Sequence, residues 1–545
     1  MIGTVTEQRY RHAVGYVIGG LIAGASGALT LSVGSPSALA QGLLPATGYD
    51  VHVGDLRSQF SQAFKDNQTV AGTHGWTISP AIDLSEAYDT GVYRRNGSFT
   101  TDLITRITPS ISAVGDGTRL SGNFYYAPTF NIYASNTKFS GIDHNLNATA
   151  TFIAIQDLLF LDLRGYAGVQ SLRGGLPTNG TAAVSQGDRQ QTASVTIKPY
   201  LRHSFDGMGT LNIGYSFERT VVDRGKTSVP LASFAPGALN GNLTTHQENA
   251  SFTTGENFGR IQNTLSAVAI QYQGVGLYAG AHRETLNDQL TYAISRVVAV
   301  NVSGGYQNIH YGSSSPYNSK GPIWGVGTTL TPNQDTSIAL NYGRLDGGTS
   351  FTLDASLAPT ARTRAYVRYS EGLETGFEAI QRALAASTVG VGGVSIDPVT
   401  GAPILVANNF FGSQSALFRT RRASLTAVWQ LTLDTLTTTI EYTNRTPALG
   451  TPSALAPAYE GVYGSVAWSH VVTDALTANT FLQYGTRAAT KSGVQATLST
   501  NISVNYAINP TLNTYAQYTH QMTSGPTFGQ PPTRDIAVIG VRKGF

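Results

Sequence analysis

The sequence contains no cysteine, and only 12% of its 545 residues are charged. The absence of cysteine excludes a disulfide framework, a lipid anchor on cysteine and a cysteine-ligated metal site. The formal net charge is only +3, and the basic residues are spread along the chain, so we expect no nucleic-acid partner. The length would suggest several soluble domains, but no interdomain linker composition occurs after residue 75.

Long hydrophobic runs are also absent after the first forty residues. Near the amino terminus, Arg9, Arg11 and His12 precede an apolar stretch at 13–33, and a small-residue Ala-x-Ala site ends at Ala40. This order is typical of an export signal, so residues 1–40 are predicted to be a signal peptide cleaved after Ala40. A membrane-spanning helix is the alternative, since the stretch is long enough, but its many small residues favour cleavage.

Residues 41–74 form a short segment before the repeating part of the chain. Leu56, Phe60, Ala63 and Phe64 lie on one face of a possible helix at 55–65. We expect this segment to lie at the periplasmic mouth or to enter the lumen of the structure described next. A poorly ordered tail is the alternative.

From residue 75 to residue 545, apolar and polar side chains alternate in runs of about ten residues. At the carboxyl end, Ala537, Ile539, Val541 and Phe545 share one face, interrupted by Lys543 near the rim. An isolated strand in lipid would leave its backbone groups unpaired, at several kilocalories per group, so such strands must close into a barrel. The fold class predicted is all-β, a transmembrane antiparallel up-and-down β-barrel closed by a C-terminal strand that ends in Phe545.

The connections give an independent estimate of the strand number, because short periplasmic turns and longer outer loops should alternate in such a barrel. Counting back from Phe545 gives about 22 strands, within a range of 18–24, with both ends periplasmic. Tight joints are predicted at 509–510, 472–474, 433–435, 359–360, 332–335, 296–298, 254–258, 205–208, 156–158 and 115–117. Longer joints include 523–532, 446–457, 371–415, 311–321, 222–244 and 173–189.

The longest joint, 371–415, contains Phe377, Ile380 and Leu384 at helical spacing, with Arg382 among them. Loops of this length usually carry function or lack order. These four residues are therefore candidates for a constriction or gate if the loop folds into the pore. The alternative is that the loop lies outside the barrel.

A set of arginines is the strongest candidate for a functional surface. Arg362, Arg364 and Arg368 share a face with Tyr366, and Arg422 on the next strand turns the same way. A charge facing lipid at mid-depth costs about 2–4 kcal/mol, so this face is predicted to line the pore. Such a wall would attract anions and can bind carboxylates with two hydrogen bonds. The alternative is that the arginines pair with acidic residues such as Asp354 on the preceding strand.

Sequence motifs for catalysis or for cofactor binding are weak. The triplet Gly225, Lys226, Thr227 lacks the earlier glycine of a phosphate-binding loop, and neither His-Glu-x-x-His nor Gly-x-Ser-x-Gly occurs. His144 and His203 adjoin other polar residues, but neighbours on a strand point to opposite faces and cannot form a dyad. We therefore expect no catalytic residues, no metal, no cofactor and no enzymatic activity.

Five stretches resemble one family of barrels. The opening strands at 76–88, 102–111 and 119–128, and the later stretches at 397–403 and 418–425, are similar to the outer-membrane barrels associated with exosortase (PEP-CTERM) and exopolysaccharide gene systems, related to the β-barrel porin 2 group. The resemblance covers most of the mature chain. It implies an outer-membrane location in a Gram-negative bacterium and a link to surface polysaccharide or surface-protein export, and it supplies no functional residues.

The function predicted is a non-enzymatic outer-membrane channel or conduit in the export or assembly of surface polysaccharide, with an arginine-lined lumen that favours anionic solutes or polymers. A general diffusion porin and a structural or adhesive scaffold with a blocked lumen are the alternatives. Expected partners are outer-membrane lipid, anionic polysaccharide or small anions, and periplasmic export or surface-assembly proteins. Active siderophore-type uptake is not favoured, because 41–74 is too short to form a plug.

Overall fold

The structure is a computed structural model. It describes residues 75–95, 98–171, 189–223, 241–312, 317–333, 335–389, 395–396, 416–448, 458–489, 493–525 and 532–545. The predictions made for residues 1–74, for the triplet at 225–227 and for the stretch at 397–403 lie outside these ranges.

Strands make up nearly all of the described chain. The first half contains β1 (Trp76–Arg95), β2 (Ser98–Asp116), β3 (Leu120–Tyr133), β4 (Gly141–Ile155), β5 (Leu159–Ser171), β6 (Arg189–Phe205), β7 (Gly209–Asp223), β8 (Gly241–Thr254), β9 (Ile261–Gln273), β10 (His282–Ala293) and β11 (Val298–Tyr311). Three short 3-10 turns lie in connections: η3 (Thr137–Phe139), η5 (Glu256–Phe258) and η6 (Gly276–Tyr278).

The second half continues the same sheet and contains the α-helix. Its barrel strands are β12 (Tyr317–Asn333), β13 (Thr336–Leu345), β14 (Gly348–Thr360), β15 (Thr363–Thr375), β18 (Leu417–Gln430), β19 (Asp434–Pro447), β20 (Tyr459–Thr473), β21 (Leu476–Ala489), β22 (Gly493–Asn509), β23 (Leu512–Ser524) and β24 (Thr533–Gly544). Between β15 and β18 lie α2 (Gly376–Ala385) and the small pair β16 (Thr388–Val389) and β17 (Ser395–Ile396).

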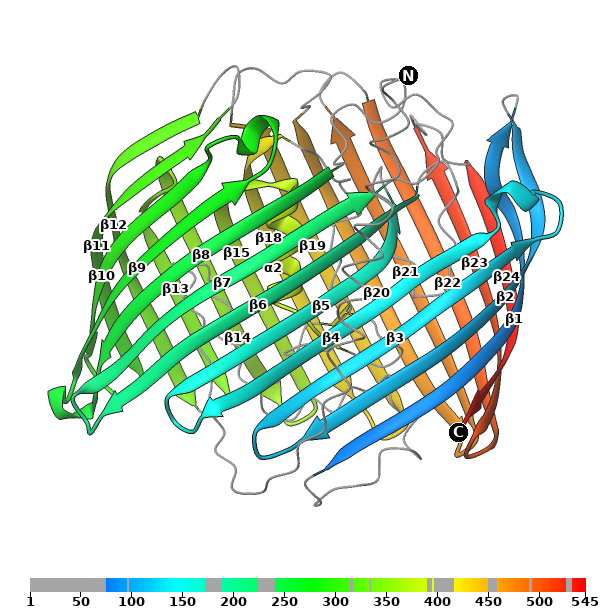
Figure 1. Cartoon of the computed structure of the whole chain (residues 1–545), viewed down its shortest axis with the longest axis horizontal. Coiled ribbons are helices and arrows are strands. Elements are labelled where there is room, and N and C mark those ends of the chain that lie inside the picture. The colour runs from blue at the N-terminus through cyan, green and yellow to red at the C-terminus, as the bar shows by residue number, and fades with distance from the viewer. Residues whose placement is uncertain are drawn as a thin grey trace.

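The described strands close into one antiparallel barrel (Figure 1). Its sheet has 22 strands, and β1 pairs with both β2 and β24. Closure leaves no strand edge, so the backbone groups of the first and last strands are paired with each other. The predicted fold class and strand number are confirmed.

All ten tight joints predicted from the sequence lie at junctions of consecutive strands, with 359–360 on the last two residues of β14. The expectation of strict alternation is wrong at the other end, because the joints at 96–97, 346–347 and 490–492 are also short. At the second of these, Asp346 and Gly347 have φ values of 53° and 73°. Two consecutive residues with positive φ make the tight hairpin turn that an Asp-Gly pair favours, so no longer loop is needed there.

The alternation of side chains sorts them to the two faces of the barrel as predicted. On one face of β24, Ile539 is 65% exposed, and Phe545, which directly follows the strand, is 75% exposed. On the other face, Ile536 and Val538 are 3% and 2% exposed. Directly paired residues share a face, so the same assignment extends from strand to strand around the barrel. Large apolar side chains therefore cover the outer surface, as a lipid-facing surface requires.

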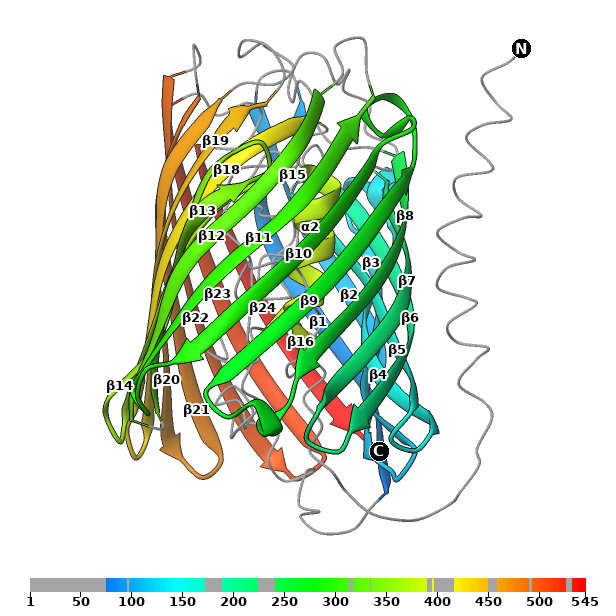
Figure 2. The ribbon, with the colours of Figure 1, turned by 90° about the vertical axis from the view of Figure 1, so that its left-hand side faces the viewer.

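The α-helix lies within the barrel rather than on its outside (Figures 1 and 2). Its neighbours include Tyr272 and Tyr311, whose strands turn Leu265 and Tyr306 outward instead. The largest buried apolar cluster lies around this helix, inside the lumen. No helix in the described part of the chain is long and apolar enough to cross a membrane.

Candidate functional site

The candidate site is the part of the lumen that contains α2. The helix begins directly after β15, where the Thr375 hydroxyl accepts a hydrogen bond from the Glu378 amide at 3.2 Å and the Glu378 carboxylate accepts one from the Thr375 amide at 2.8 Å. This reciprocal capping box satisfies backbone donors that a helix start otherwise leaves unpaired. The chain thus turns from strand to helix at a fixed residue and enters the lumen.

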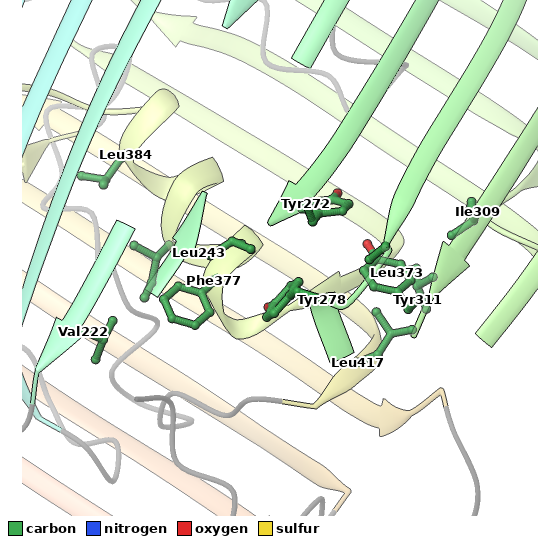
Figure 3. Packing of buried hydrophobic residues seen from close by; sticks show 12 residues of the cluster. Val222, Leu243, Tyr272, Tyr278, Ile309, Tyr311, Leu373, Phe377, Leu384 and Leu417 are labelled. Atoms are coloured by element: carbon green, nitrogen blue, oxygen red, sulfur yellow. The ribbon is translucent and has the colours of Figure 1, made fainter. Parts of the chain in front are cut away.

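One face of α2 is apolar and packs on the barrel wall (Figure 3). Phe377, Ile380 and Leu384 are at most 3% exposed. They belong to a buried cluster that also contains Val222, Leu243, Tyr272, Tyr278, Tyr311, Leu373 and Leu417. The described start of the loop, α2, therefore lies inside the barrel. Its three apolar residues are buried against the wall, which is where apolar surface is most stable.

Polar contacts hold the same helix to four strands of the wall. The Glu378 carboxylate accepts hydrogen bonds from the hydroxyls of Tyr272 and Tyr311, the second at 2.6 Å. Gln381 donates to the hydroxyls of Thr220 and Thr245 at 3.4 and 3.2 Å. These contacts on β7, β8, β9 and β11 fix the helix in a single position.

Two neighbouring groups complete the attachment. Just beyond the helix, Arg164 on β5 donates to the Ser387 carbonyl at 3.0 Å and to its hydroxyl at 2.7 Å. Tyr278 lies in the turn η6 with its ring centroid 5.9 Å from that of Phe377. Burial, followed by the nearby Glu378 carboxylate, raises the pKa of Tyr278 well above its ordinary value, so its hydroxyl stays neutral.

The opposite edge of α2 carries charge. The Glu374 carboxylate lies 2.7 Å from Arg382, 3.7 Å from Arg422 and 3.8 Å from Arg445. Arg422 is also 3.4 Å from Glu441. We call these five residues the arginine cluster. Three guanidinium groups face two carboxylates, so the cluster has one positive charge in excess.

The structure separates the predicted arginines. Arg364, Tyr366 and Arg368 lie on β15 in the register that pairs them with Val428, Thr426 and Ser424, whose strand turns Leu425 outward. They face the lumen, as does Arg422. Arg362 does not belong to this wall, because it lies in the turn between β14 and β15 and is exposed.

Ion pairing, the alternative considered for these arginines, holds for two of them. Arg368 lies 3.3 Å from Asp354, and Arg422 contacts Glu374 and Glu441. Arg382, predicted as part of a gate, is in the arginine cluster. Paired interior charges brace the wall and weaken the field that a row of free cations would produce.

Two residues of the site, Arg445 and Asp346, were not predicted from the sequence. The alternation of β19 could have indicated Arg445, since it shares a face with Thr443 and Glu441. Asp346, at the tip of the β13–β14 hairpin, accepts hydrogen bonds from Gln307 Nε2 and the Leu373 amide, both at 3.1 Å, and lies 3.3 Å from Arg283. It ties the strand end before α2 to β10 and β11. The Asp-Gly turn signal could have located the hairpin, but its contacts are long-range.

Other chemistry is limited in the described chain. No group of three or more His, Cys, Asp or Glu residues is placed to hold a metal ion there. His144 contacts the Tyr126 hydroxyl at 3.0 Å, and the His203 ring lies 4.5 Å from that of Phe205. Both are polar residues of the barrel wall, as expected.

A closed antiparallel barrel with apolar side chains outside and a polar, partly occupied lumen belongs to the class of outer-membrane β-barrels with a channel-like fold. No family model and no curated protein matches the chain.

Several solved structures are similar to it. The siderophore receptor PiuA from Acinetobacter baumannii is 8% identical with a TM-score of 0.47, covering 85% of this chain and 82% of that one. The FrpB iron transporter from Neisseria meningitidis (F3-3 variant) is 9% identical with a TM-score of 0.49, covering 89% and 83%. The ferric-catecholate import receptor Fiu from E. coli K12, in its open form, is 11% identical with a TM-score of 0.44, covering 85% and 81%. These names describe those proteins and assign no cargo to this chain.

Proposed function

We propose that this chain is an outer-membrane conduit for surface polysaccharide that favours anionic chains. The observation that carries the proposal is the arginine cluster on the open edge of a helix held inside a closed barrel. The resemblance of the opening strands to barrels associated with exosortase and exopolysaccharide systems supports polysaccharide as the cargo. Membership of that family is part of the proposal.

The mechanism is selection by width and charge. The helix lies inside the barrel wall (Figure 2), so a polymer that passes through the lumen would meet its charged edge. There the side chains of Arg382, Glu441 and Arg422 are 31%, 26% and 24% exposed, while that of Glu374 is 4% exposed. The accessible groups of the cluster are thus two cations and one anion, and guanidinium groups can bind carboxylates or sulfates with two hydrogen bonds.

Two other functions share this fold. A general diffusion porin would conduct small ions with little dependence on the arginine cluster. A structural or adhesive scaffold would keep its lumen closed and use its outer loops. Both are distinguished from a polysaccharide conduit by conductance and selectivity, so a single experiment separates the three.

The experiment measures single-channel current and reversal potential in planar bilayers for the full chain and for Arg364→Ala and Arg382→Ala. We expect both substitutions to lower the anion-to-cation permeability ratio, by about two- to tenfold for the pair combined, because each removes a lumen cation. Arg296→Ala, in an exposed turn between β10 and β11, is the control and should leave the ratio unchanged. A conducting barrel with an unchanged ratio would contradict the arginine mechanism, and a barrel without current would favour the scaffold.

A further inference from the structure

On the wall of β20 to β23 the lumen has a different chemistry from that around α2. In two neighbouring rows of inward residues there, the side chains are uncharged and most carry hydroxyl or amide groups. Gln483 on β21 pairs directly with Ser465 on β20 and with Ser499 on β22, and all three share the inner face. A second row lies two residues further along these strands, toward the end of the barrel with the longer joints. It consists of Tyr463, Gly485, Thr497 and Thr523. We call these two rows the amide patch.

Gln483 is the unusual residue of the amide patch. It is 1% exposed, and neither its Oε1 nor its Nε2 has a hydrogen-bond partner among the residues that the structure describes. Thr523 is 5% exposed, and its hydroxyl likewise has no hydrogen-bond partner among the described residues. Buried polar groups are nearly always hydrogen-bonded, and a buried amide that lacks both partners is a strongly unfavourable arrangement.

The residues on either side of the patch are satisfied. Toward the long-joint end, Arg487 donates to Gln495 at 2.7 Å. Toward the tight-turn end, Asn501 donates to Thr519 at 2.8 Å. The patch thus lies between two positions of the wall whose side chains are hydrogen-bonded to each other.

The chemistry of the patch indicates what would satisfy it. An amide offers two donors and one acceptor, and a threonine hydroxyl offers a donor and an acceptor, so the complementary ligand must both donate and accept. The absence of charge within the two rows disfavours an ion. The rings of Tyr463 and of Phe481, two residues before Gln483 on the same face, supply apolar surface beside these polar groups, and Gly485 adds no side chain between them. Hydroxyl groups on a compact carbon framework match this combination.

We infer that Gln483 and Thr523 form a sugar-binding subsite in the lumen wall, which takes the hydroxyl groups of a polysaccharide chain while the arginine cluster attracts its anionic groups. This inference rests on the proposed function and deepens it, because it names a neutral contact for the same cargo. The subsite would give each passing residue of the polymer a short-lived contact on the wall of β20 to β23.

The test measures binding to the full chain purified in detergent, by isothermal titration calorimetry, so it does not depend on conduction. The probes are a neutral dextran oligosaccharide of about six glucose units and a polyethylene glycol of similar length, which accepts hydrogen bonds but donates almost none. We expect the oligosaccharide to bind and the glycol not to bind. Gln483→Leu should weaken oligosaccharide binding about tenfold, and Thr523→Val should weaken it by a smaller factor.

Gln289→Leu is the matched control, because Gln289 is an inward glutamine on β10 that donates to the Thr291 hydroxyl. It should leave oligosaccharide affinity unchanged. If Gln483→Leu raises the thermal midpoint and leaves affinity unchanged, or if the oligosaccharide binds no better than the glycol, the subsite does not exist. Loss of the subsite alone would leave the anion selectivity of the arginine cluster intact, so the two proposals fail separately.

Discussion

Glu378 is the side chain on which the contacts of α2 converge. Its carboxylate accepts hydrogen bonds from the Thr375 amide and from the hydroxyls of Tyr272 and Tyr311. A carboxylate that accepts several hydrogen bonds inside a protein replaces its lost hydration with fixed donors. One residue thus both starts the helix and attaches it to β9 and β11.

We expect Glu378→Ala to lower the free energy of unfolding by several kilocalories, at about 1–3 kcal/mol for each buried donor left without an acceptor. Urea titration in detergent micelles, followed by tyrosine and tryptophan fluorescence, measures the change. Glu256→Ala, at an exposed position in η5, provides the comparison and should change stability by less than about 0.5 kcal/mol. Equal stability of the two variants would show that the helix is held by its apolar face alone.

At the scale of the element, α2 is a short helix whose position depends on tertiary packing. A helix of ten residues is marginal by itself in water, so the wall must supply most of its stability. Its buried face contacts side chains from β7 to β11, and Arg382 on its other edge pairs with Glu374 on β15, whose carboxylate also lies near Arg422 on β18 and Arg445 on β19. The helix therefore contacts two parts of the barrel wall from inside the lumen, and we expect it to narrow the passage.

We expect Ile380→Asp to displace α2 from the wall, because Ile380 is fully buried and an unpaired carboxylate is highly unfavourable there. The expected result is a larger and noisier single-channel conductance in planar bilayers. Ala385→Asp introduces the same charge at an exposed position of the same helix and should leave conductance nearly unchanged. Identical currents from both variants would mean that the helix does not limit the passage.

At the scale of the whole molecule, the barrel depends on its closing seam between β1 and β24. Arg534 on β24 donates to the Asp89 carboxylate on β1 through Nε at 2.9 Å and through a terminal nitrogen at 2.5 Å. The side chains are 6% and 1% exposed. This two-pronged pair joins the first and last strands at the end of the seam far from Trp76 and Phe545, where the backbone pairing of the seam ends.

Arg534→Met should destabilise the closed barrel by about 3–5 kcal/mol, because it leaves the Asp89 carboxylate buried without its cation. The temperature at which the folded band disappears in a heat-modifiability gel gives the readout. The double variant Arg534→Met with Asp89→Leu should recover much of the loss, since neither charge then remains. Asp535→Asn, at the neighbouring half-buried position that contacts Tyr518 and His520 but not Asp89, is the control. A double variant as weak as the single one would indicate that the pair is not the cause.

The sequence by itself determined the architecture, because the alternation of side chains reports which face each residue of a strand presents. It predicted the 22 strands, the ten tight turns, the outward face of β24 and the inward face of Arg364, Arg368 and Arg422. It also placed a helix among Phe377, Ile380 and Leu384.

The tertiary structure alone decided what these residues contact. Periodicity is local, whereas the seat of α2 on β7 to β11, the pairing of Glu374 with Arg445, the reach of Asp346 to Gln307 and the isolation of the Gln483 amide all join residues from different strands. Such contacts depend on the curvature and closure of the whole barrel, and the pattern within one strand carries no information about them.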